Sequence, residues 1–451
     1  MKGTIVLHPA MGRGHLVPMV ELGKFIYTHH HQNLPIKILL PSPPNSTTLQ
    51  YIAAVSATTP SITFHHLSPS QHLLHVLQTL ISQSSKPKAF ILDFFNHSAA
   101  DVTRTLKIPT YYYFPNSASC VALFLYTPTI HYNTKKGFSS YSDTLRRIPG
   151  LPPLSPEDMP TSLLDRRSFE SFANMSIQMR KTDGIIVNTF EKLENKAFFA
   201  LKNGICMSLE THKSHSSTPE TRNPRVFCMG PLVSNGGGEH DNDDSGCMSW
   251  LDSQPSRTVV FLSFGSYGRF SKSQIREIAL GLERSGQRFL WVMRNPNERS
   301  ELILEELLPK GFLERTKERG MVMKNWAPQV KILSHDSVGG FVTHCGWNSV
   351  LEAVSWGVPM VSWPLYAEQR LNRVVMVEEM KVALALKENE DGFVRASELE
   401  ERVRELMDSE RGRGKEVRER VLSARYDAVA ALSDGGSSRV ELNDLVELWM
   451  Q

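Results

Sequence analysis

The chain has 451 residues, more than one ordinary hydrophobic core accommodates, so at least two domains are expected. Hydrophobic residues make up 41% of the chain, charged residues 22%, and the net charge is +3, which gives no electrostatic footprint for a nucleic acid or a membrane surface. The five cysteines form no C-x-x-C pair and are odd in number, which favours a reducing, cytoplasmic compartment over a disulfide framework. No apolar run approaches about 18 residues and the N-terminus is not typical of a signal peptide, so no membrane insertion is predicted.

In the first half of the chain, short apolar runs alternate with segments whose sequence is typical of helices. A strand is predicted over residues 4–9, a turn over 13–15 and a helix over 16–27, where apolar residues recur at helical spacing. Further strands are predicted at residues 36–40, 62–65, 89–92, 110–114 and 184–188. Strands alternating with helices indicate a parallel, doubly wound α/β sheet. Residues 208–246 are polar and Gly-rich, which predicts a surface loop and interdomain linker.

After this linker the alternation restarts. Strands are predicted at residues 258–263, 289–293, 321–324, 340–343, 360–362 and 382–386, with a helix over 271–285. Ser397 and Glu400 match a capping box, which marks the start of a helix. The sequence that follows is rich in charged residues and is predicted to be helical. We therefore predict an N-terminal domain over residues 1–240, a C-terminal domain over 241–435, and a terminal helix over 436–451 that packs back on the N-terminal domain.

The segment T-H-C-G-W-N-S, starting at residue 343, joins a predicted strand to a predicted helix. Unpaired N–H groups and the dipole at a helix start favour phosphate, so His344, Asn348 and Ser349 are candidate anion ligands. Glu352 lies one helical turn beyond Asn348 and could accept hydrogen bonds from ribose hydroxyls. The alternative is a capped core helix whose turn residues only satisfy the backbone.

Trp326 follows a predicted strand and precedes Ala-Pro, where its ring is available to stack on a flat base; the alternative is a core aromatic. Residues 326–369 have the length, 44 residues, of the donor-binding box of the plant secondary-product glycosyltransferases, and they resemble it closely. The shared elements are W-x-P-Q, L-x-H, G-x-F-x-T-H-C-G-W-N-S, E, G-V-P, P and the final Q. GIIVNTFEKLE (184–194), VVFLSFGS (259–266) and RFLWV (288–292) extend the resemblance.

This resemblance to the UDP-glycosyltransferase superfamily implies a GT-B fold, in which two doubly wound Rossmann-like domains face each other across a cleft. It implies that the N-terminal domain binds the acceptor and the C-terminal domain binds the UDP-sugar. Gln369 is typical of relatives that use glucose, and Trp347 argues against glucuronate, whose users carry an Arg there to pair with the carboxylate. Glu368 departs from the more usual Asp. The donor-binding residues that the resemblance implies are Ser266, Trp326, Ala327, Gln329, His344, Gly346, Trp347, Asn348, Ser349, Glu352, Glu368 and Gln369.

His15, after the first predicted strand, is a candidate general base. Glycosyl transfer needs the acceptor hydroxyl deprotonated as it attacks C1, and a neutral imidazole suits this task, contributing roughly 10² to 10⁴ in rate. Its other nitrogen needs a partner, for which Asp93 at a strand end is the candidate and Asp101, in helical text, the competitor. In the family that the chain resembles, the His of the G-x-G-H turn is the base and the first Asp of V-x-D-x-F pairs with it, which implies His15 and Asp93.

These observations predict inverting transfer of glucose from UDP-glucose to a hydroxyl of a small aromatic acceptor (flavonoid, chalcone, dihydrochalcone or simple phenol), giving a β-O-glucoside. Phe114, Phe124 and Phe190 are predicted to line the acceptor pocket; otherwise they are ordinary core. C-glucosylation, another UDP-sugar, and UDP-sugar binding without catalysis are alternatives. So is a nicotinamide oxidoreductase, which the missing third Gly of G-x-G-x-x-G disfavours.

Metal ligands are not evident in the sequence. The histidines at 29–31 and the acidic run at 241–244 lack metal-ligand spacing. We expect no metal and no cofactor other than UDP-glucose as co-substrate, no nucleic-acid partner, and a monomer.

Overall fold

A computed structural model describes residues 3–29, 34–41, 43–67, 72–83, 86–134, 143–207, 223–234, 246–296 and 302–451. The chain forms two compact units: unit 1 comprises Met1–Glu239 and Ala428–Gln451, and unit 2 comprises His240–Asp427. Residues 30–31, the acidic run 241–244 and most of the predicted linker lie outside the described ranges. None of the described helices is long and apolar enough to cross a membrane.

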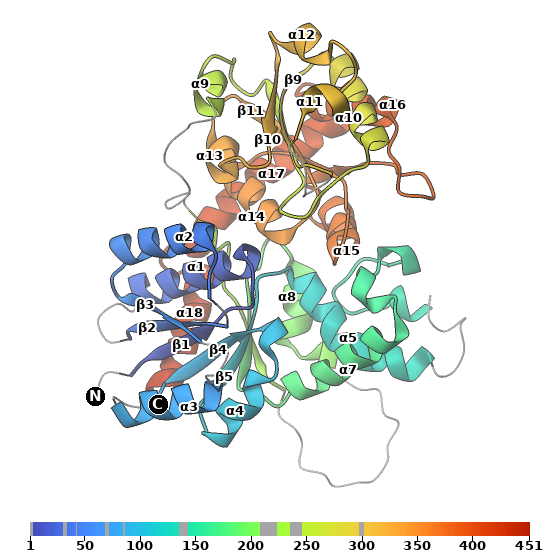
Figure 1. The fold of residues 1–451 in the computed structure, drawn as a ribbon. Helices are drawn as coiled ribbons and strands as arrows, with labels where there is room; N and C mark the ends of the chain where they lie inside the picture. The colour runs from blue at the N-terminus through green and yellow to red at the C-terminus, as the bar shows by residue number, and fades with distance from the viewer. Residues whose placement is uncertain are drawn as a thin grey trace. The chain divides into compact units, whose positions relative to one another are not determined.

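The described part of unit 1 contains a seven-stranded parallel sheet in the order β3-β2-β1-β4-β5-β6-β7 (Figure 1). Its strands are β1 (Ile5–His8), β2 (Ile36–Leu40), β3 (Ile62–His66), β4 (Ala89–Asp93), β5 (Thr110–Phe114), β6 (Gly184–Val187) and β7 (Arg225–Cys228). Its α-helices are α1 (Arg13–His29), α2 (Ser46–Thr58), α3 (Leu73–Gln83), α4 (Ala99–Thr105), α5 (Ala118–Thr134), α7 (Arg166–Met179), α8 (Asn195–Lys202) and α18 (Ser437–Met450). Short helical turns are η1 (Phe94–Asn96), η2 (Pro156–Asp158), η3 (Thr161–Leu163) and η4 (Ile205–Met207).

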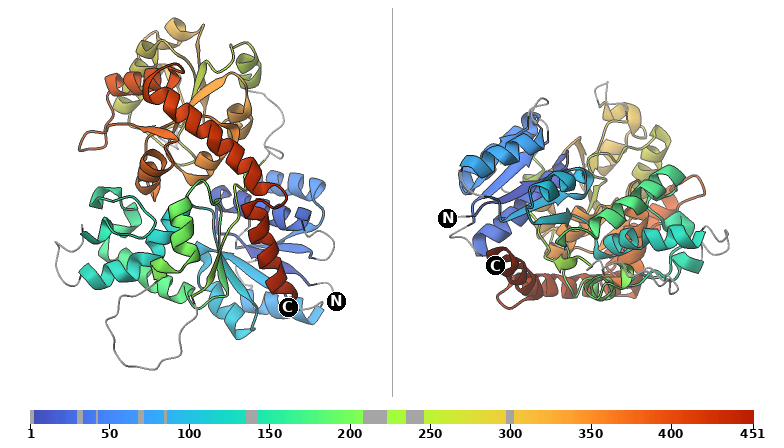
Figure 2. Two further views of the ribbon diagram at one scale, coloured as in Figure 1. Left: turned by 180° about the vertical axis from the view of Figure 1, so that it is seen from behind. Right: turned by 90° about the horizontal axis from the view of Figure 1, so that it is seen from below.

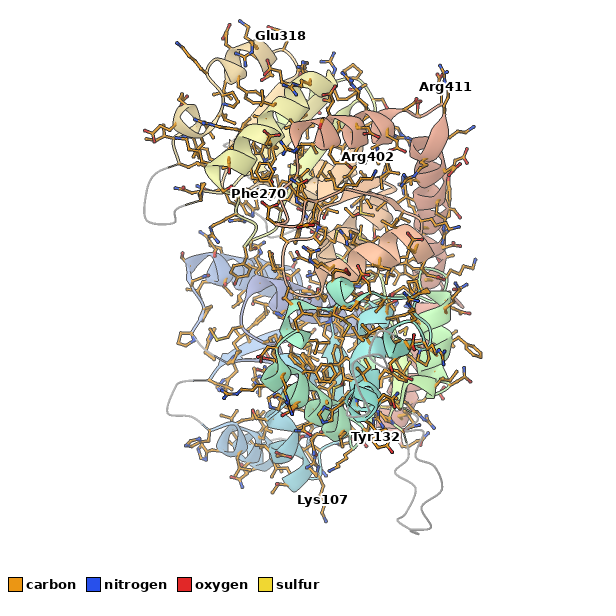
Figure 3. The ribbon with its side chains drawn as sticks, turned by 90° about the vertical axis from the view of Figure 1, so that its right-hand side faces the viewer. Lys107, Tyr132, Phe270, Glu318, Arg402 and Arg411 are labelled. Carbon is orange, nitrogen blue, oxygen red and sulfur yellow. The ribbon has the colours of Figure 1, made fainter. Side chains whose placement is uncertain are left out.

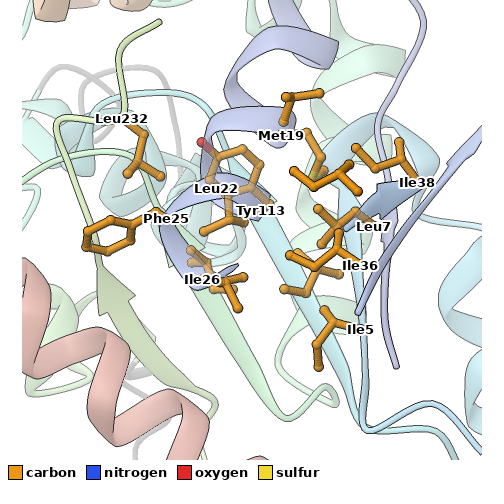
Figure 4. Close-up of a cluster of buried hydrophobic side chains, with 14 of the residues drawn as sticks. Ile5, Leu7, Met19, Leu22, Phe25, Ile26, Ile36, Ile38, Tyr113 and Leu232 are labelled. Atoms are coloured by element: carbon orange, nitrogen blue, oxygen red, sulfur yellow. The ribbon is translucent and has the colours of Figure 1, made fainter. Parts of the chain in front are cut away.

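Helices cover both faces of this sheet, so its central strands are buried throughout. In β1, Ile5 and Leu7 join a cluster with Met19 and Leu22 of α1 (Figure 4), whereas Val6 joins a second cluster on the opposite face. Side chains alternate across a strand, so burial on both sides explains why these strands read as continuous apolar runs. The last helix, α18, packs against β7 (Figure 2).

The described part of unit 2 contains a six-stranded parallel sheet in the order β10-β9-β8-β11-β12-β13. Its strands are β8 (Val259–Ser263), β9 (Arg288–Met293), β10 (Gly320–Lys324), β11 (Val338–Thr343), β12 (Met360–Ser362) and β13 (Ala383–Ala385). Its helices are α9 (Cys247–Asp252), α10 (Lys272–Ser285), α11 (Leu304–Leu307), α12 (Phe312–Thr316), α13 (Gln329–Ser334), α14 (Trp347–Trp356), α15 (Gln369–Val374), the π-helical η5 (Val375–Glu379), α16 (Ala396–Met407) and α17 (Gly412–Leu432), whose last residues belong to unit 1. Phe270, labelled in Figure 3, packs edge-on against Phe264 at 4.6 Å between ring centroids.

Several predicted strand bounds differ from the observed ones by one or two residues, and three other details also differ from the sequence predictions. Helix α1 begins at Arg13, because the amides of His15 and Leu16 both donate to the Gly12 carbonyl, so His15 lies in its first turn. Strand β7 lies inside the predicted linker, where a short apolar run pairs with β6. The capping box is wrong: α16 begins at Ala396, and its N-cap, Arg395, makes no side-chain cap hydrogen bond.

Candidate active site

Each sheet has a point where the strand order reverses, and ligands of open α/β sheets bind there at the carboxyl ends of the strands. In unit 1 this point lies between β1 and β4; His15 follows β1, and Asp93 is the last residue of β4. In unit 2 it lies between β8 and β11, which are followed by Ser266 and His344. The topology therefore brings the predicted catalytic residues together in one unit and many of the predicted donor residues together in the other.

His15 and Asp93 form a hydrogen-bonded pair. Nδ1 of His15 lies 2.9 Å from Oδ2 of Asp93. An ionised carboxylate can only accept, so Nδ1 of His15 is the donor in this hydrogen bond. The Asp93 side chain is 1% exposed and that of His15 30% exposed. The imidazole is thus held at Nδ1 by a buried carboxylate, and part of the ring is exposed.

The backbone around this pair fixes the carboxylate. The second oxygen of Asp93, Oδ1, accepts from the amide of Phe95 at 3.0 Å. The amide Nδ2 of Asn96 donates to the carbonyls of His8 (3.2 Å) and Pro9 (2.9 Å), which ties η1 to the end of β1. Both oxygens of Asp93 therefore have fixed partners, and the two strand ends are joined directly.

Phe95 is a site residue that the sequence analysis missed. Its ring lies edge-on to that of His15, with 5.3 Å between centroids, and it is 59% exposed. Phe94 and Phe95 are adjacent and equally apolar, so the sequence alone gives no signal for which one packs inward. Only the backbone of η1 decides this.

The predicted acceptor aromatics lie in the core of unit 1. Phe114 and Phe124 pack around Phe94, with ring centroids 4.9 and 4.7 Å from it, and both are buried. Phe190 is fully buried. The competing carboxylate, Asp101, is exposed on α4 and pairs with Arg104 at 2.8 Å.

In unit 2, the imidazole of His344 fills a slot between two glycines. A Cβ atom on Gly265 would stand 2.6 Å from its Nε2, and one on Gly346 would stand 2.5 Å from it. Burial lowers the pKa of His344 to about 4, so the ring is neutral at pH 7. Cys345, the next residue, has φ +66°, a left-handed conformation that costs a residue with a Cβ on the order of 1 kcal/mol. Gly346 is the N-cap of α14 and supplies no side-chain cap.

Three predicted donor residues meet across α13 and α14. The amide Nε2 of Gln329 donates to Oγ of Ser349 at 2.8 Å and to Oε2 of Glu352 at 2.7 Å. Trp326 follows β10 and is 39% exposed, so part of its ring surface can meet a ligand.

The remaining predicted donor residues differ in exposure. Ala327 and Trp347 are buried, Asn348 is half-buried and Ser266 is exposed. Glu368 is half-buried and stands at the N-cap of α15. Gln369 is 2% exposed, and its Oε1 accepts from the amides of Leu365 and Tyr366, both at 2.9 Å.

Two further residues, which the sequence does not reveal as site residues, form hydrogen bonds to these turns. Nε of Arg294 donates to the carbonyl of Gly265 at 2.7 Å, and Nδ2 of Asn372 donates to the carbonyl of Cys345 at 2.9 Å. Both contacts join segments far apart in the sequence, which local patterns cannot reveal. Among the described residues, no three His, Cys, Asp or Glu side chains gather as a metal site would require.

Two Rossmann-like α/β units, each with polar groups gathered at its strand-order reversal, define a protein of the GT-B fold. A family model, UDP-glucoronosyl and UDP-glucosyl transferase, matches residues 228–414. UDP-glycosyltransferase 13 of Pueraria montana var. lobata is 89% identical over 100% of both chains, and isoflavone 7-O-glucosyltransferase 1 of Glycine max is 49% identical over 100% of both. The structure of Phytolacca americana UGT2 complexed with UDP-2fluoro-glucose and pterostilbene matches with a TM-score of 0.84 and 34% identity over 100% of both chains. The chain belongs to the UDP-glycosyltransferase family of plant enzymes.

Proposed function

We propose that this enzyme transfers glucose from UDP-glucose to a hydroxyl of a small aromatic acceptor, with inversion at C1, to give a β-O-glucoside. The observation that carries the proposal is the 2.9 Å hydrogen bond from His15 to the buried Asp93 at the strand-order reversal of unit 1. Unit 1 is the acceptor-binding part and unit 2 the donor-binding part.

In this mechanism His15 is the general base. Its Nε2 takes the proton of the acceptor hydroxyl as the oxygen attacks C1 from the face opposite UDP, and the C1–O bond to the diphosphate breaks in the same displacement. Asp93 keeps the imidazole in the required tautomer and stabilises the imidazolium that forms. The leaving diphosphate is stabilised by the N-terminus of α14 and by His344.

The proposed donor contacts are made by residues of unit 2. Trp326 stacks on the uracil beside Ala327, while Gln329 and Glu352, already joined at 2.7 Å, hold the ribose. Ser266, His344, Asn348 and Ser349, with the backbone at Gly346, hold the diphosphate, and Trp347, Glu368 and Gln369 contact the glucose. No metal or further cofactor has a role in this scheme.

For the acceptor, the support comes from relatives and from one exposed ring. One structural neighbour is complexed with pterostilbene, and relatives are named as isoflavone and anthocyanidin glucosyltransferases. Phe95, exposed beside His15, offers an aromatic surface to a flat phenol or flavonoid. None of the five cysteines, all of which lie in the described ranges, forms a disulfide, which supports a reducing, cytoplasmic location; we propose a monomer.

The test is a mass-spectrometric donor screen. Purified protein receives UDP-glucose, UDP-galactose, UDP-glucuronate or UDP-xylose together with pooled flavonoids, dihydrochalcones and simple phenols. We expect a product heavier by one hexose with UDP-glucose, from which acid hydrolysis releases the free acceptor. An acid-stable product would instead indicate a C-glucoside, and product only with another donor would contradict the roles of Trp347, Glu368 and Gln369.

A further inference from the structure

Asn372 is a fully buried polar residue of α15 with no role in the scheme above. It lies one helical turn after Gln369, on the same side of the helix. Its Nδ2 donates to the carbonyl of Cys345 at 2.9 Å, across 27 residues of sequence. The residue therefore connects α15 directly to the turn between β11 and α14.

That turn is held in an unusual conformation. Cys345 has φ +66°, which residues with a Cβ rarely adopt, and such a conformation persists only when its surroundings determine it. Its amide donates to Oγ1 of Thr343 at 3.3 Å. Thr343 therefore binds the N–H of Cys345, and Asn372 binds its carbonyl. The turn in this conformation places His344 between Gly265 and Gly346 and starts α14 at Trp347.

The other end of the connection is also held by side-chain hydrogen bonds. Oε1 of Gln369 accepts from two successive amides, those of Leu365 and Tyr366, and this closes the loop before α15. Asn372, Gln369 and Glu368 thus belong to one helical turn, which the buried amide of Asn372 joins to the carbonyl of Cys345.

We infer that Asn372 is a positioning residue that joins the diphosphate-binding turn of unit 2 to its sugar-binding segment. This inference rests on the proposed function, because the ligands of the two segments are those of UDP-glucose. If Asn372 loses its donor, the Cys345 carbonyl is left buried without this partner and the turn relaxes. His344 and the start of α14 then move relative to the diphosphate, while Trp326, Gln329 and Glu352, which hold the nucleoside, keep their positions.

The experiment compares ligands of increasing length on Asn372→Leu, which keeps the side-chain volume but removes the donor. Dissociation constants are measured for uridine, UDP and UDP-glucose, by ligand-observed NMR for uridine and by calorimetry for the other two. We expect the uridine constant to stay within about twofold of wild type and UDP binding to weaken by about tenfold or more, the size of a lost hydrogen bond to a charged group. Gln274→Met is the matched control, since Gln274 is also a buried amide of unit 2 that donates to a backbone carbonyl, that of Val394. It should lower the melting temperature and leave UDP binding unchanged.

Equal weakening of uridine and UDP, or no weakening of either, would overturn the inference. If Asn372→Leu does not fold, the same dissociation constants are measured on Thr343→Val. This variant removes the hydrogen bond from the Cys345 amide to Thr343 Oγ1, so it should produce the same selective loss of UDP affinity. Wild-type protein that does not bind UDP would overturn the proposed function and this inference with it, whereas UDP binding that Asn372→Leu and Thr343→Val leave intact overturns the inference alone.

Discussion

In the proposed mechanism the partly exposed imidazole of His15 takes the proton, and the buried carboxylate of Asp93 stabilises the charge that results. His15→Ala removes the base, and we expect kcat to fall by about 10² to 10⁴. Asp93→Asn keeps the shape but removes the charge that stabilises the imidazolium, so a fall of about 10² or more is expected. Initial rates at saturating UDP-glucose measure both effects, and UDP affinity should be unchanged.

Asp101→Asn is the matched control for this prediction, because Asp101 is a carboxylate of the same unit that is exposed and paired with Arg104. It should keep wild-type kcat. A loss at Asp101 equal to that at Asp93 would contradict the assignment of the carboxylate.

The neutral ring of His344 predicts a pH dependence of stability. The unfolded chain protonates this imidazole as the pH falls through 6.5, whereas the folded chain, whose pKa burial lowers, does so only near about 4. The unfolded state binds more protons between these values, so folding stability decreases as the pH falls from 6.5 towards 4. The full difference corresponds to about 3 kcal/mol.

His344→Gln keeps a polar side chain but cannot titrate, so it should lose less stability than wild type on acidification. Melting temperatures of both proteins at pH 7 and pH 5 measure the difference. An equal decrease in both would mean that His344 does not remain neutral in the folded protein.

Among the elements, the turn between β11 and α14 needs a residue without a side chain at Gly346. Gly346 has φ −65°, which alanine adopts freely, so Gly346→Ala tests only the 2.5 Å approach of a new Cβ to the His344 ring. We expect the displaced ring to weaken UDP binding by about tenfold, measured by calorimetry. Gly286→Ala is the control: with φ +71° and no atom within 4 Å of the added Cβ, it should cost about 1 kcal/mol of stability and leave UDP binding unchanged.

The elements also show what the sequence can and cannot predict. Apolar runs such as those of β1 and β8 are visible because both faces of each sheet are buried. The start of α16 was misplaced because Ser397 and Glu400 fit a local capping pattern that the chain does not use. Phe95 and Asn372 could not be predicted for a different reason. Phe95 contacts His15 and Asn372 contacts Cys345, and the two residues of each pair are far apart in the sequence.

For the whole molecule, the chain leaves unit 1 near residue 239 and returns to it within α17. The returning segment is secured by α18, where Oε1 of Glu441 lies 2.7 Å from Nζ of Lys202 on α8. Nζ of Lys202 also donates to the carbonyl of Val226 in β7 at 3.1 Å, and Oγ of Ser438 donates to the carbonyl of Gly230 at 2.6 Å. These bonds make the C-terminal helix an integral part of unit 1.

The ion pair should therefore contribute to the stability of the enzyme more than an exposed pair does. Glu441→Leu leaves the Lys202 ammonium in a partly buried site without its partner, and we expect a loss of about 1–2 kcal/mol, less than for a fully buried pair because the Lys202 side chain is 33% exposed. Replacing both partners, Lys202→Met with Glu441→Leu, removes the unpaired charge and should restore most of that loss. Thermal unfolding of the three proteins measures the effect. A double variant less stable than Glu441→Leu alone would mean that Lys202 acts mainly through the Val226 carbonyl, and that the charge of Glu441 is not what holds α18 in place.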